Sequence, residues 1–296
     1  MAFLGDGLHW HWTFDEEGDH TVTRVSTPTA YDDVARGLSP ILNNGTASDC
    51  GSTTESKQGP QAWRMSNTAH LLRTEFDDVG CSHGQSFAVG MWASKMTGTQ
   101  GIAGSWLASR RSANNTGPQR EWQLFVSNSV GARIQIWSTE LVDYSAVCSP
   151  NFHPEIDQYF YILVGWDADA RELRVFVNDT HQGIEHLPGV DMNTNCGSRL
   201  ILGVGGWGSS PDWTQAAYRL DEFSFWRGVA PTQEMAEALY NGDVGLSFAE
   251  ILTTRTTEAF ALRHNPRTNK VIPVLSAPTV TDIGANCVRP RVTKGY

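Results

Sequence analysis

One segment, residues 218–226 (YRLDEFSFW), constrains the fold more than any other part of the chain. Its apolar and polar residues alternate as they do along a β-strand, with every second side chain on the same face. Leu220 and Phe223 break this parity, because an odd number of positions separates them. We therefore expect a long strand that carries a β-bulge at Asp221–Glu222.

A short helix is predicted directly after this strand, over residues 231–240. Pro231 suits the first turn of a helix, and Gly242 stands just beyond the expected end. It is the only helix that the sequence indicates convincingly.

The rest of the chain carries short segments rich in Val, Ile, Phe and Trp, separated by turn-forming residues. Near the start, Trp10, Trp12 and Phe14 share one face of a predicted strand, and the residues between them share the other. Residues 172–178 alternate in the same way. A period of two is typical of half-buried antiparallel strands, so the pattern predicts an all-β sandwich or barrel.

Several of these segments together resemble a known family. They are His9–Glu16, Ser86–Ala93, Glu121–Val126, Ala132–Trp137, Tyr161–Asp167, Glu172–Asp179 and the strand and helix over 218–241. Their order and spacing, from about residue 5 to about residue 248, resemble those of laminin-G-like (concanavalin A-like) jelly-roll domains. The resemblance implies a two-sheet antiparallel jelly-roll sandwich. That fold usually binds glycans or protein partners and is only sometimes an enzyme.

The length of the chain allows one large sandwich with an appendage, or two domains. The chain has 296 residues, of which 40% are hydrophobic and eleven are Trp, which is ample for a core. We expect a domain over 1–250, with a long insertion at about 26–80 that is rich in Ser, Thr, Asn, Gly and Asp. No apolar run approaches the roughly 18 residues of a membrane span. The first residues lack a basic, apolar leader, so we expect synthesis in a cytoplasm without secretion.

The segment 251–296 differs from the domain in charge. It holds seven basic and two acidic residues, a net of +5, so that residues 1–250 carry −15 of the total of −10. The basic residues are Arg255, Arg263, Arg267, Lys270, Arg289, Arg291 and Lys294. Residues 271–280 are apolar and interrupted by prolines, which favours extended backbone. The sequence predicts a basic C-terminal arm that docks on an acidic partner. A strap over the chain's own acidic domain is the alternative. The acidic domain itself is not expected to bind nucleic acid.

Five cysteines give little evidence of a disulfide framework. Cys50, Cys81, Cys148, Cys196 and Cys287 are odd in number and show no C-x-x-C spacing. Buried, reduced thiols are the favoured interpretation. A Cys50–Cys81 bond remains open.

Catalytic patterns are absent from the sequence. A retaining glycosidase needs two carboxyls about 5 Å apart, whereas Asp221 and Glu222 would point to opposite faces of a regular strand. There is no G-x-S-x-G, phosphate-binding Gly loop or H-E-x-x-H motif. His9 and His11 could share a metal with a third ligand, but solvent-facing or hydrogen-bonded histidines are the favoured interpretation. We therefore expect no enzyme.

The candidate ligand-binding residues lie in two predicted loops. Trp207, Asp212 and Trp213 stand in one, and Asn114 and Asn115 stand in the other. Aromatic rings can stack on sugars, while Asp and Asn accept hydrogen bonds from sugar hydroxyls. Alternatively, the two Trp fix the loop or lie in an oligomer interface.

The resemblance also raises the question of calcium. Many members of the family bind Ca²⁺ through an early acidic residue and loop carbonyls, but Arg24 stands near the place where that acid is often found. Asp15 and Asp221 match the family's motifs and are the candidate Ca²⁺ ligands. A Ca²⁺ site needs about six to eight oxygen ligands in all.

Taken together, these observations favour a non-enzymatic virion protein. We expect a phage head decoration or tail appendage, made in the host cytoplasm and oligomeric, that presents a lectin-like, glycan-binding domain and docks on capsid or tail proteins through its C-terminal arm. A free carbohydrate-binding lectin or adhesin is the first alternative, and a glycoside hydrolase is the second.

Overall fold

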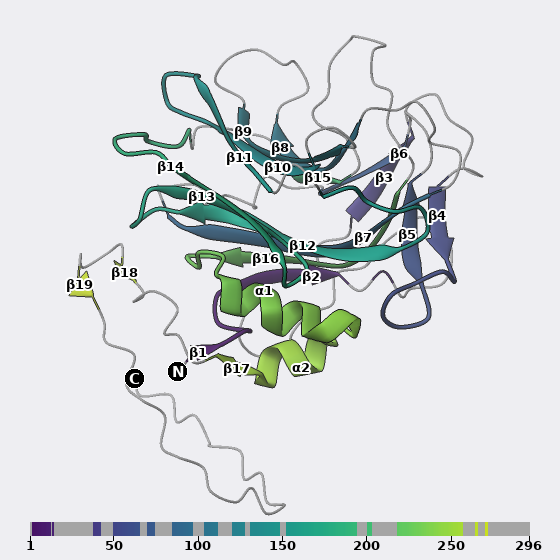
Figure 1. The fold of residues 1–296 in the computed structure, drawn as a ribbon. Helices are drawn as coiled ribbons and strands as arrows, with labels where there is room; N and C mark the ends of the chain where they lie inside the picture. The colour runs from purple at the N-terminus through teal and green to yellow at the C-terminus, as the bar shows by residue number, and fades with distance from the viewer. Residues whose placement is uncertain are drawn as a thin grey trace, which may run out of the picture. The chain divides into compact units, whose positions relative to one another are not determined.

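The protein is an all-β sandwich with a small helical layer, as the sequence predicted (Figure 1). The computed structural model describes residues 2–12, 14, 38–42, 50–65, 70–74, 85–96, 104–111, 120–127, 131–148, 152–193, 200–202, 218–256, 264–265 and 270–271. The chain divides into two compact units, residues 1–261 and 262–296. Two antiparallel sheets pack face to face in the first unit.

The first sheet, here called the helix-covered sheet, is built around two long central strands, β7 and β16. Its order is β14-β13-β12-β7-β16-β5-β4, and β2 also pairs with β16. The strands are β2 (Leu8–Trp12), β4 (Cys50–Thr53), β5 (Ala62–Met65), β7 (Phe87–Lys95), β12 (Tyr159–Asp167), β13 (Glu172–Val177), β14 (His181–His186) and β16 (Tyr218–Arg227). β12 and β13, which contain the segments Tyr161–Asp167 and Glu172–Val177 of the resemblance, form an antiparallel pair.

The opposite sheet, here called the second sheet, has the order β11-β10-β9-β8-β15-β6-β3. The strands are β3 (Leu38–Leu42), β6 (His70–Thr74), β8 (Gly104–Arg111), β9 (Arg120–Ser127), β10 (Gly131–Trp137), β11 (Asp143–Val147) and β15 (Leu200–Leu202). In the sequence, β9, β10 and β11 are consecutive, so this end of the sheet is a simple meander. β11 is an edge strand.

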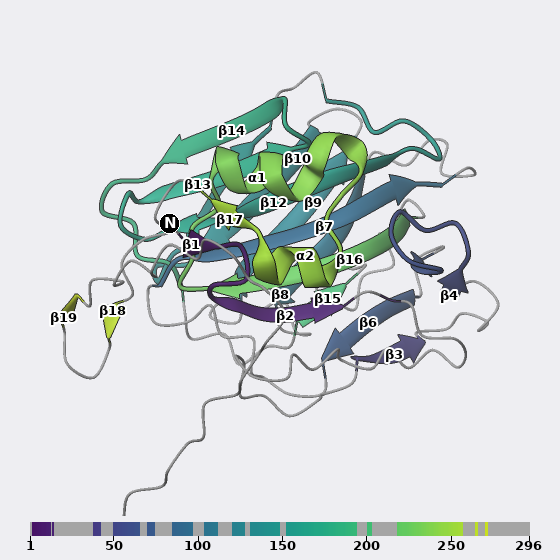
Figure 2. The same cartoon turned by 90° about the horizontal axis from the view of Figure 1, so that it is seen from below.

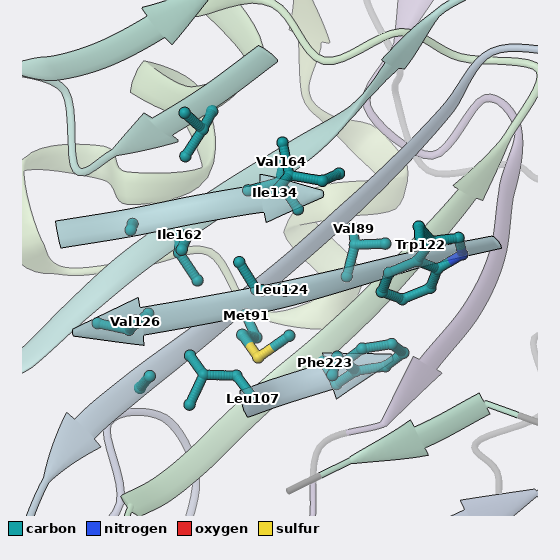
Figure 3. Packing of buried hydrophobic residues seen from close by; sticks show 14 of the residues in the cluster. Val89, Met91, Leu107, Trp122, Leu124, Val126, Ile134, Ile162, Val164 and Phe223 are labelled. Atoms are coloured by element: carbon teal, nitrogen blue, oxygen red, sulfur yellow. The ribbon is translucent and has the colours of Figure 1, made fainter. Parts of the chain in front are cut away.

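The main core fills the space between the two sheets. Figure 3 shows how aliphatic side chains from β7, β9, β10 and β12 meet there, with Trp122 and Phe223 among them. The ring of Trp12 stacks on Phe223, with 4.8 Å between the centroids. Trp12 and Phe14 belong to the same buried cluster, which confirms the face predicted for the opening strand. Stacked rings of this kind add about 0.5–1.5 kcal/mol beyond their buried area.

The bulge predicted in β16 is present. The register of β16 against β7 shifts between Asp221 and Ser224. Glu222 takes up the extra position with a φ of 51°, in the left-handed region that a non-glycine residue seldom adopts. The backbone N–H of Glu222 donates to Oδ1 of Asp221 at 2.9 Å. Because the bulge adds one residue to the strand, Leu220 and Phe223 both point into the core although an odd number of positions separates them.

Helices cover the outer face of the helix-covered sheet (Figure 2). The predicted helix is α1 (Gln233–Tyr240), which begins after its N-cap Thr232, whose hydroxyl accepts from the N–H of Met235. Its apolar side packs on a second buried cluster that includes Trp92, Tyr161 and Trp226.

A second helix, α2 (Phe248–Thr253), was not predicted, and it forms because Ser247 and Glu250 make a reciprocal capping box. It is followed by β17 (Arg255–Thr256), which pairs with β1 (Ala2–Phe3). None of the helices in the described residues has the length and apolar character needed to cross a membrane.

Little of the predicted C-terminal arm belongs to the described residues. Arg255 lies in β17 of the first unit, and Lys270 lies in β19 (Lys270–Val271), which pairs with β18 (His264–Asn265) in the second unit. The other residues assigned to partner docking, Arg263, Arg267, Arg289, Arg291 and Lys294, lie outside the described residues. The arm's docking role stays a prediction.

Candidate functional site

The outer face of the second sheet presents polar side chains from three adjacent strands. Along β9, Trp122 and Leu124 point into the core, so the alternation of a strand sends Gln123 and Phe125 to the opposite face. The same alternation in β10 sends Arg133 outward. These side chains therefore lie outside the core between the two sheets.

Strand register arranges these side chains in rows. In one row, Phe125 lies opposite Arg133, and Arg133 lies opposite Val147. In the next row, Gln123 lies opposite Gln135, which lies opposite Ser145, while Asp143 lies opposite Trp137 in the row after that. Directly opposite Cβ atoms in a sheet are about 4.5–5.5 Å apart, so the groups within a row are neighbours.

Hydrogen bonds link the amides of this face. Nε2 of Gln123 donates to Oε1 of Gln135, and Nε2 of Gln135 donates to Oδ2 of Asp143 at 2.7 Å. These bonds fix both amides and leave Oδ1 of the exposed Asp143 as a free acceptor among the described residues. The half-buried Ser145 hydroxyl also has no partner among them.

Arg133 is the positively charged group of the face. Its guanidinium lies over the ring of Phe125, 5.2 Å from the centroid, and its Nε is buried without a hydrogen-bond partner in the described part of the chain. Burial lowers the pKa of Arg133 from its usual value, because it penalises the charged form, and the nearby Asp143 carboxylate partly offsets this. The cation is therefore only partly compensated.

Exposure increases across the face from β8 to β11. Ser109 and Gln123, which lie opposite each other on β8 and β9, are buried. In contrast, Arg133 and Gln135 are half-buried. The accessible part, here called the β9–β11 outer face, consists of Phe125, Arg133, Gln135, Asp143 and Ser145. It combines an aromatic ring, an amide, a hydroxyl, a carboxylate and a guanidinium, and the buried Gln123 donates to the amide of Gln135.

A second polar group lies buried in the helix-covered sheet. Nδ1 of His11 is 2.7 Å from Oγ of Ser224, and its Nε2 is 2.5 Å from Oε2 of Glu222. The order serine, histidine, carboxylate is that of a hydrolytic triad. However, Ser224 is only 1% exposed and Glu222 only 5%, so that no substrate reaches the hydroxyl. The cluster joins β2 to β16. Of the two roles that the sequence left open for His11, solvent-facing or hydrogen-bonded, the structure shows the second.

Asp221, a candidate Ca²⁺ ligand, anchors a loop. Its Oδ2 accepts from the backbone N–H groups of Lys57 and Gln58 at 2.8 and 2.9 Å, and its Oδ1 accepts from Glu222. Within the described ranges, no three His, Cys, Asp or Glu side chains gather as a metal site. Asp15 lies outside these ranges. A calcium site that uses both residues remains a prediction.

The loop residues proposed from the sequence are not among those that the structure describes. Trp207, Asp212, Trp213, Asn114 and Asn115 all lie outside them. Cys148 is buried. Cys81 lies outside the described residues, so a bond between Cys50 and Cys81 is untested.

Sequence reasoning missed the β9–β11 outer face, although its signal is visible. Gln123 and Gln135 interrupt two apolar strands at positions that alternate with core residues. Their pairing depends on register, which the sequence pattern did not specify.

The comparisons with known proteins establish the fold. No protein-family model matches the chain, and no curated protein matches it in sequence. Among solved structures, "HCR/D-Sa-GBL1/C" has a TM-score of 0.56 at 9% identity, over 81% of this chain and 53% of that one. The botulinum neurotoxin serotype D ligand binding domain in complex with N-acetylneuraminic acid has a TM-score of 0.55 at 9% identity, over 80% and 51%.

The binding domain of botulinum neurotoxin DC in complex with SialylT has a TM-score of 0.54 at 8% identity, over 81% of this chain and 52% of that one. The chain thus spans about half the length of the solved structures that it matches. At such low identity the likeness concerns the fold alone. The chain is an antiparallel β-sandwich of the kind found in these neurotoxin binding domains.

Proposed function

We propose that this protein is a non-enzymatic carbohydrate-binding domain that holds its ligand on the β9–β11 outer face. The observation that carries the proposal is the set of unlike polar groups around one aromatic ring on adjacent strands. Sugars present hydroxyls that both donate and accept, together with apolar C–H faces. A ring beside fixed donors and acceptors matches that chemistry.

The rigidity of the face supports this function. Gln123, Gln135 and Asp143 are joined by hydrogen bonds, and their strands form a continuous meander. Side chains that are already fixed lose little conformational entropy when a ligand binds. A flat, preorganised sheet face therefore suits a weakly binding polar ligand better than loops would.

Proteins with this fold add further support. Two of the solved structures that match it were determined with N-acetylneuraminic acid and with SialylT. The ligands belong to those proteins, and they show that sugar binders occur among proteins that contain the fold.

The absence of catalysis is part of the proposal. Ser224, which stands in the only arrangement resembling a catalytic triad that we find among the described residues, is buried. Asp221 is occupied by backbone N–H donors. These groups serve the fold, and we expect no release of reducing ends from any polysaccharide.

The setting that we propose is a virion, with a homo-oligomeric protein held on a head or tail by its basic C-terminal segment. The charge contrast supports this, since residues 251–296 carry +5 and residues 1–250 carry −15. Neutralising Arg263, Arg267, Lys270, Arg289, Arg291 and Lys294 to Gln in the full chain should release the protein from purified particles. A free lectin would show no association with particles before or after the change.

The binding function is tested on a glycan array with the full chain. Gln135→Ala removes the central amide of the face, and Gln182→Ala removes an exposed amide of β14 in the other sheet as a matched control. We expect retention on the array to fall about tenfold or more for Gln135→Ala, the equivalent of about 1.4 kcal/mol. The control should behave as the unchanged protein does. Equal retention of all three, or no retention of any glycan, would refute the proposal.

A further inference from the structure

Arg133 differs in its ion pairing from four other described arginines. Arg110, Arg171, Arg174 and Arg219 each contact at least one carboxylate. Arg133 makes no such contact within the described residues, and Asp143, the nearest acidic group to influence it, is instead bound by Gln135. Within the described ranges, this partly buried cation thus has no carboxylate in contact with it.

The orientation of this cation is fixed. The guanidinium lies on the ring of Phe125, and the opposite side of Arg133 meets Val147 in the same row. A guanidinium held beside a ring can keep its terminal N–H groups as a fork that donates two parallel hydrogen bonds to a carboxylate. The Nε of Arg133 is buried in the part of the chain that the structure describes, so a ligand would meet the terminal Nη groups.

The face is polarised along the strands. The backbone of the Asp143 row lies four residues along β10 from that of the Arg133 row, about 13 Å at the usual rise of a strand, and the Asp143 carboxylate is bound by Gln135 between them. One end therefore presents a cation, the other presents a carboxylate, and Gln135 and Ser145 lie between them. An anionic group is attracted at the first end and repelled at the second, which gives a bound chain one orientation.

We propose that the β9–β11 outer face selects oligosaccharides that carry a carboxylate, with this group paired to Arg133 and the neutral hydroxyls at Gln135, Ser145 and Asp143. This inference rests on the proposed carbohydrate-binding function and names its ligand class. The carboxylate is favoured over a sulfate because the guanidinium fork matches the planar carboxylate.

The charge of the whole protein makes this selection specific. Residues 1–250 carry −15, so the protein does not attract acidic glycans from a distance. At physiological ionic strength the field is screened within about 8 Å, and the local contact with Arg133 decides binding. A preference for acidic sugars would therefore come from the local contact with Arg133 and not from the net charge of the protein.

The test compares ligands that differ in one group. The full chain is titrated with an oligosaccharide that ends in a carboxylate-bearing sugar, with the same compound after reduction of the carboxylate to the alcohol, and with a sulfated form of the neutral compound. The variants are Arg133→Gln, Arg133→Lys and the distant control Arg171→Gln, whose arginine is exposed and paired with Asp191. Melting temperatures check that each variant is folded.

We expect the carboxylated compound to bind about tenfold or more tightly than its reduced form. Arg133→Gln should remove this difference and change the affinity for the reduced compound less than about threefold. Arg133→Lys should retain only part of the preference, since it keeps the charge and loses the fork. Arg171→Gln should bind as the unchanged protein does.

The two levels of the proposal fail in different ways. If the reduced and carboxylated compounds bind equally and Arg133→Gln has no effect, the selectivity is refuted while carbohydrate binding stands. Tighter binding of the sulfated form than of the carboxylated form also refutes it. If the unchanged protein binds no glycan at all, both the carbohydrate-binding function and the selectivity for a carboxylate are refuted.

Discussion

His11 and Glu222 meet in the buried layer between the helix-covered sheet and the helices, with 2.5 Å between Nε2 and Oε2, although 211 positions separate them in the sequence. The contact fastens the N-terminal strand β2 to the bulge of β16. Ser224 approaches the other nitrogen of the ring at 2.7 Å. Glu222 holds a left-handed backbone conformation there, and such conformations persist only where the surroundings impose them.

The His11–Glu222 contact should be strongly coupled. Removing one partner leaves an uncompensated polar group in a buried site, so Glu222→Ala and His11→Ala should each lower the free energy of unfolding by about 3–5 kcal/mol. The double variant should cost clearly less than the sum of the two. Urea denaturation of the three variants provides the double-mutant cycle. Additive effects would show that the two groups stabilise the fold separately.

Asp221 should be essential to the loop that joins β4 and β5. Asp221→Asn keeps the size of the side chain but weakens or replaces the one acceptor, Oδ2, that holds the backbone N–H groups of both Lys57 and Gln58. We expect about 1–3 kcal/mol of lost stability and faster proteolysis within residues 54–61. The loss should be the same in calcium and in a chelator. A loss seen only in calcium would instead make Asp221 a ligand, as the sequence suggested.

Much of the fold followed from local pattern. The alternation in residues 172–178, the aromatic face of Trp12 and Phe14, and the parity break in β16 all predicted features that the structure contains. These succeed because a strand with one buried face imposes a period of two on its own sequence. The short helix α2 was missed, although Ser247 and Glu250 carry its capping signal.

The candidate site was less accessible to sequence reasoning. Gln123 and Gln135 come together through the β9–β10 register, and Arg133 becomes notable only because no described carboxylate pairs with it. Which side chains form a hydrogen bond or an ion pair depends on the three-dimensional arrangement of the strands, which the sequence pattern does not specify. The loops around Trp207 and Asn114, which the sequence favoured, lie outside the described residues.

Gly183 should be irreplaceable where the edges of the two sheets meet. A Cβ at this position of β14 would lie 2.1 Å from the carbonyl oxygen of Val147 in β11. Gly183→Ala must therefore push β11 away, at a cost of about 1–3 kcal/mol for overpacking. Because β11 carries Asp143 and Ser145, we also expect weaker glycan binding. The matched change Gly189→Ala meets no atom within 4 Å, although its φ of +78° adds strain.

Calorimetry and glycan titration of these two glycine variants separate the effects. Gly189→Ala should lower stability by about 1 kcal/mol through its backbone alone and leave binding unchanged. Equal affinity of Gly183→Ala and the unchanged protein would show that β11 does not transmit the shift to the outer face.

Stability should fall steeply in alkali because of buried tyrosines. Burial raises the pKa of Tyr161 well above its usual value near 10, and the carboxylate of Glu222 raises it further. Burial also raises the pKa of Tyr218. Above pH 10 the unfolded chain loses these protons while the folded protein keeps them, so the unfolded state binds fewer protons and the free energy of unfolding decreases as pH rises. Below pH 10 the contribution is complete.

Each such tyrosine adds a slope of about 1.4 kcal/mol per pH unit above its unfolded pKa. Tyr161→Phe should therefore flatten the decline between pH 10 and 11, as measured by urea denaturation at a series of pH values. A surface tyrosine would contribute no slope, because its pKa is the same in both states. If the decline is unchanged in Tyr161→Phe, the phenol is not held protonated by its surroundings, and the buried polar layer around Glu222 must admit water.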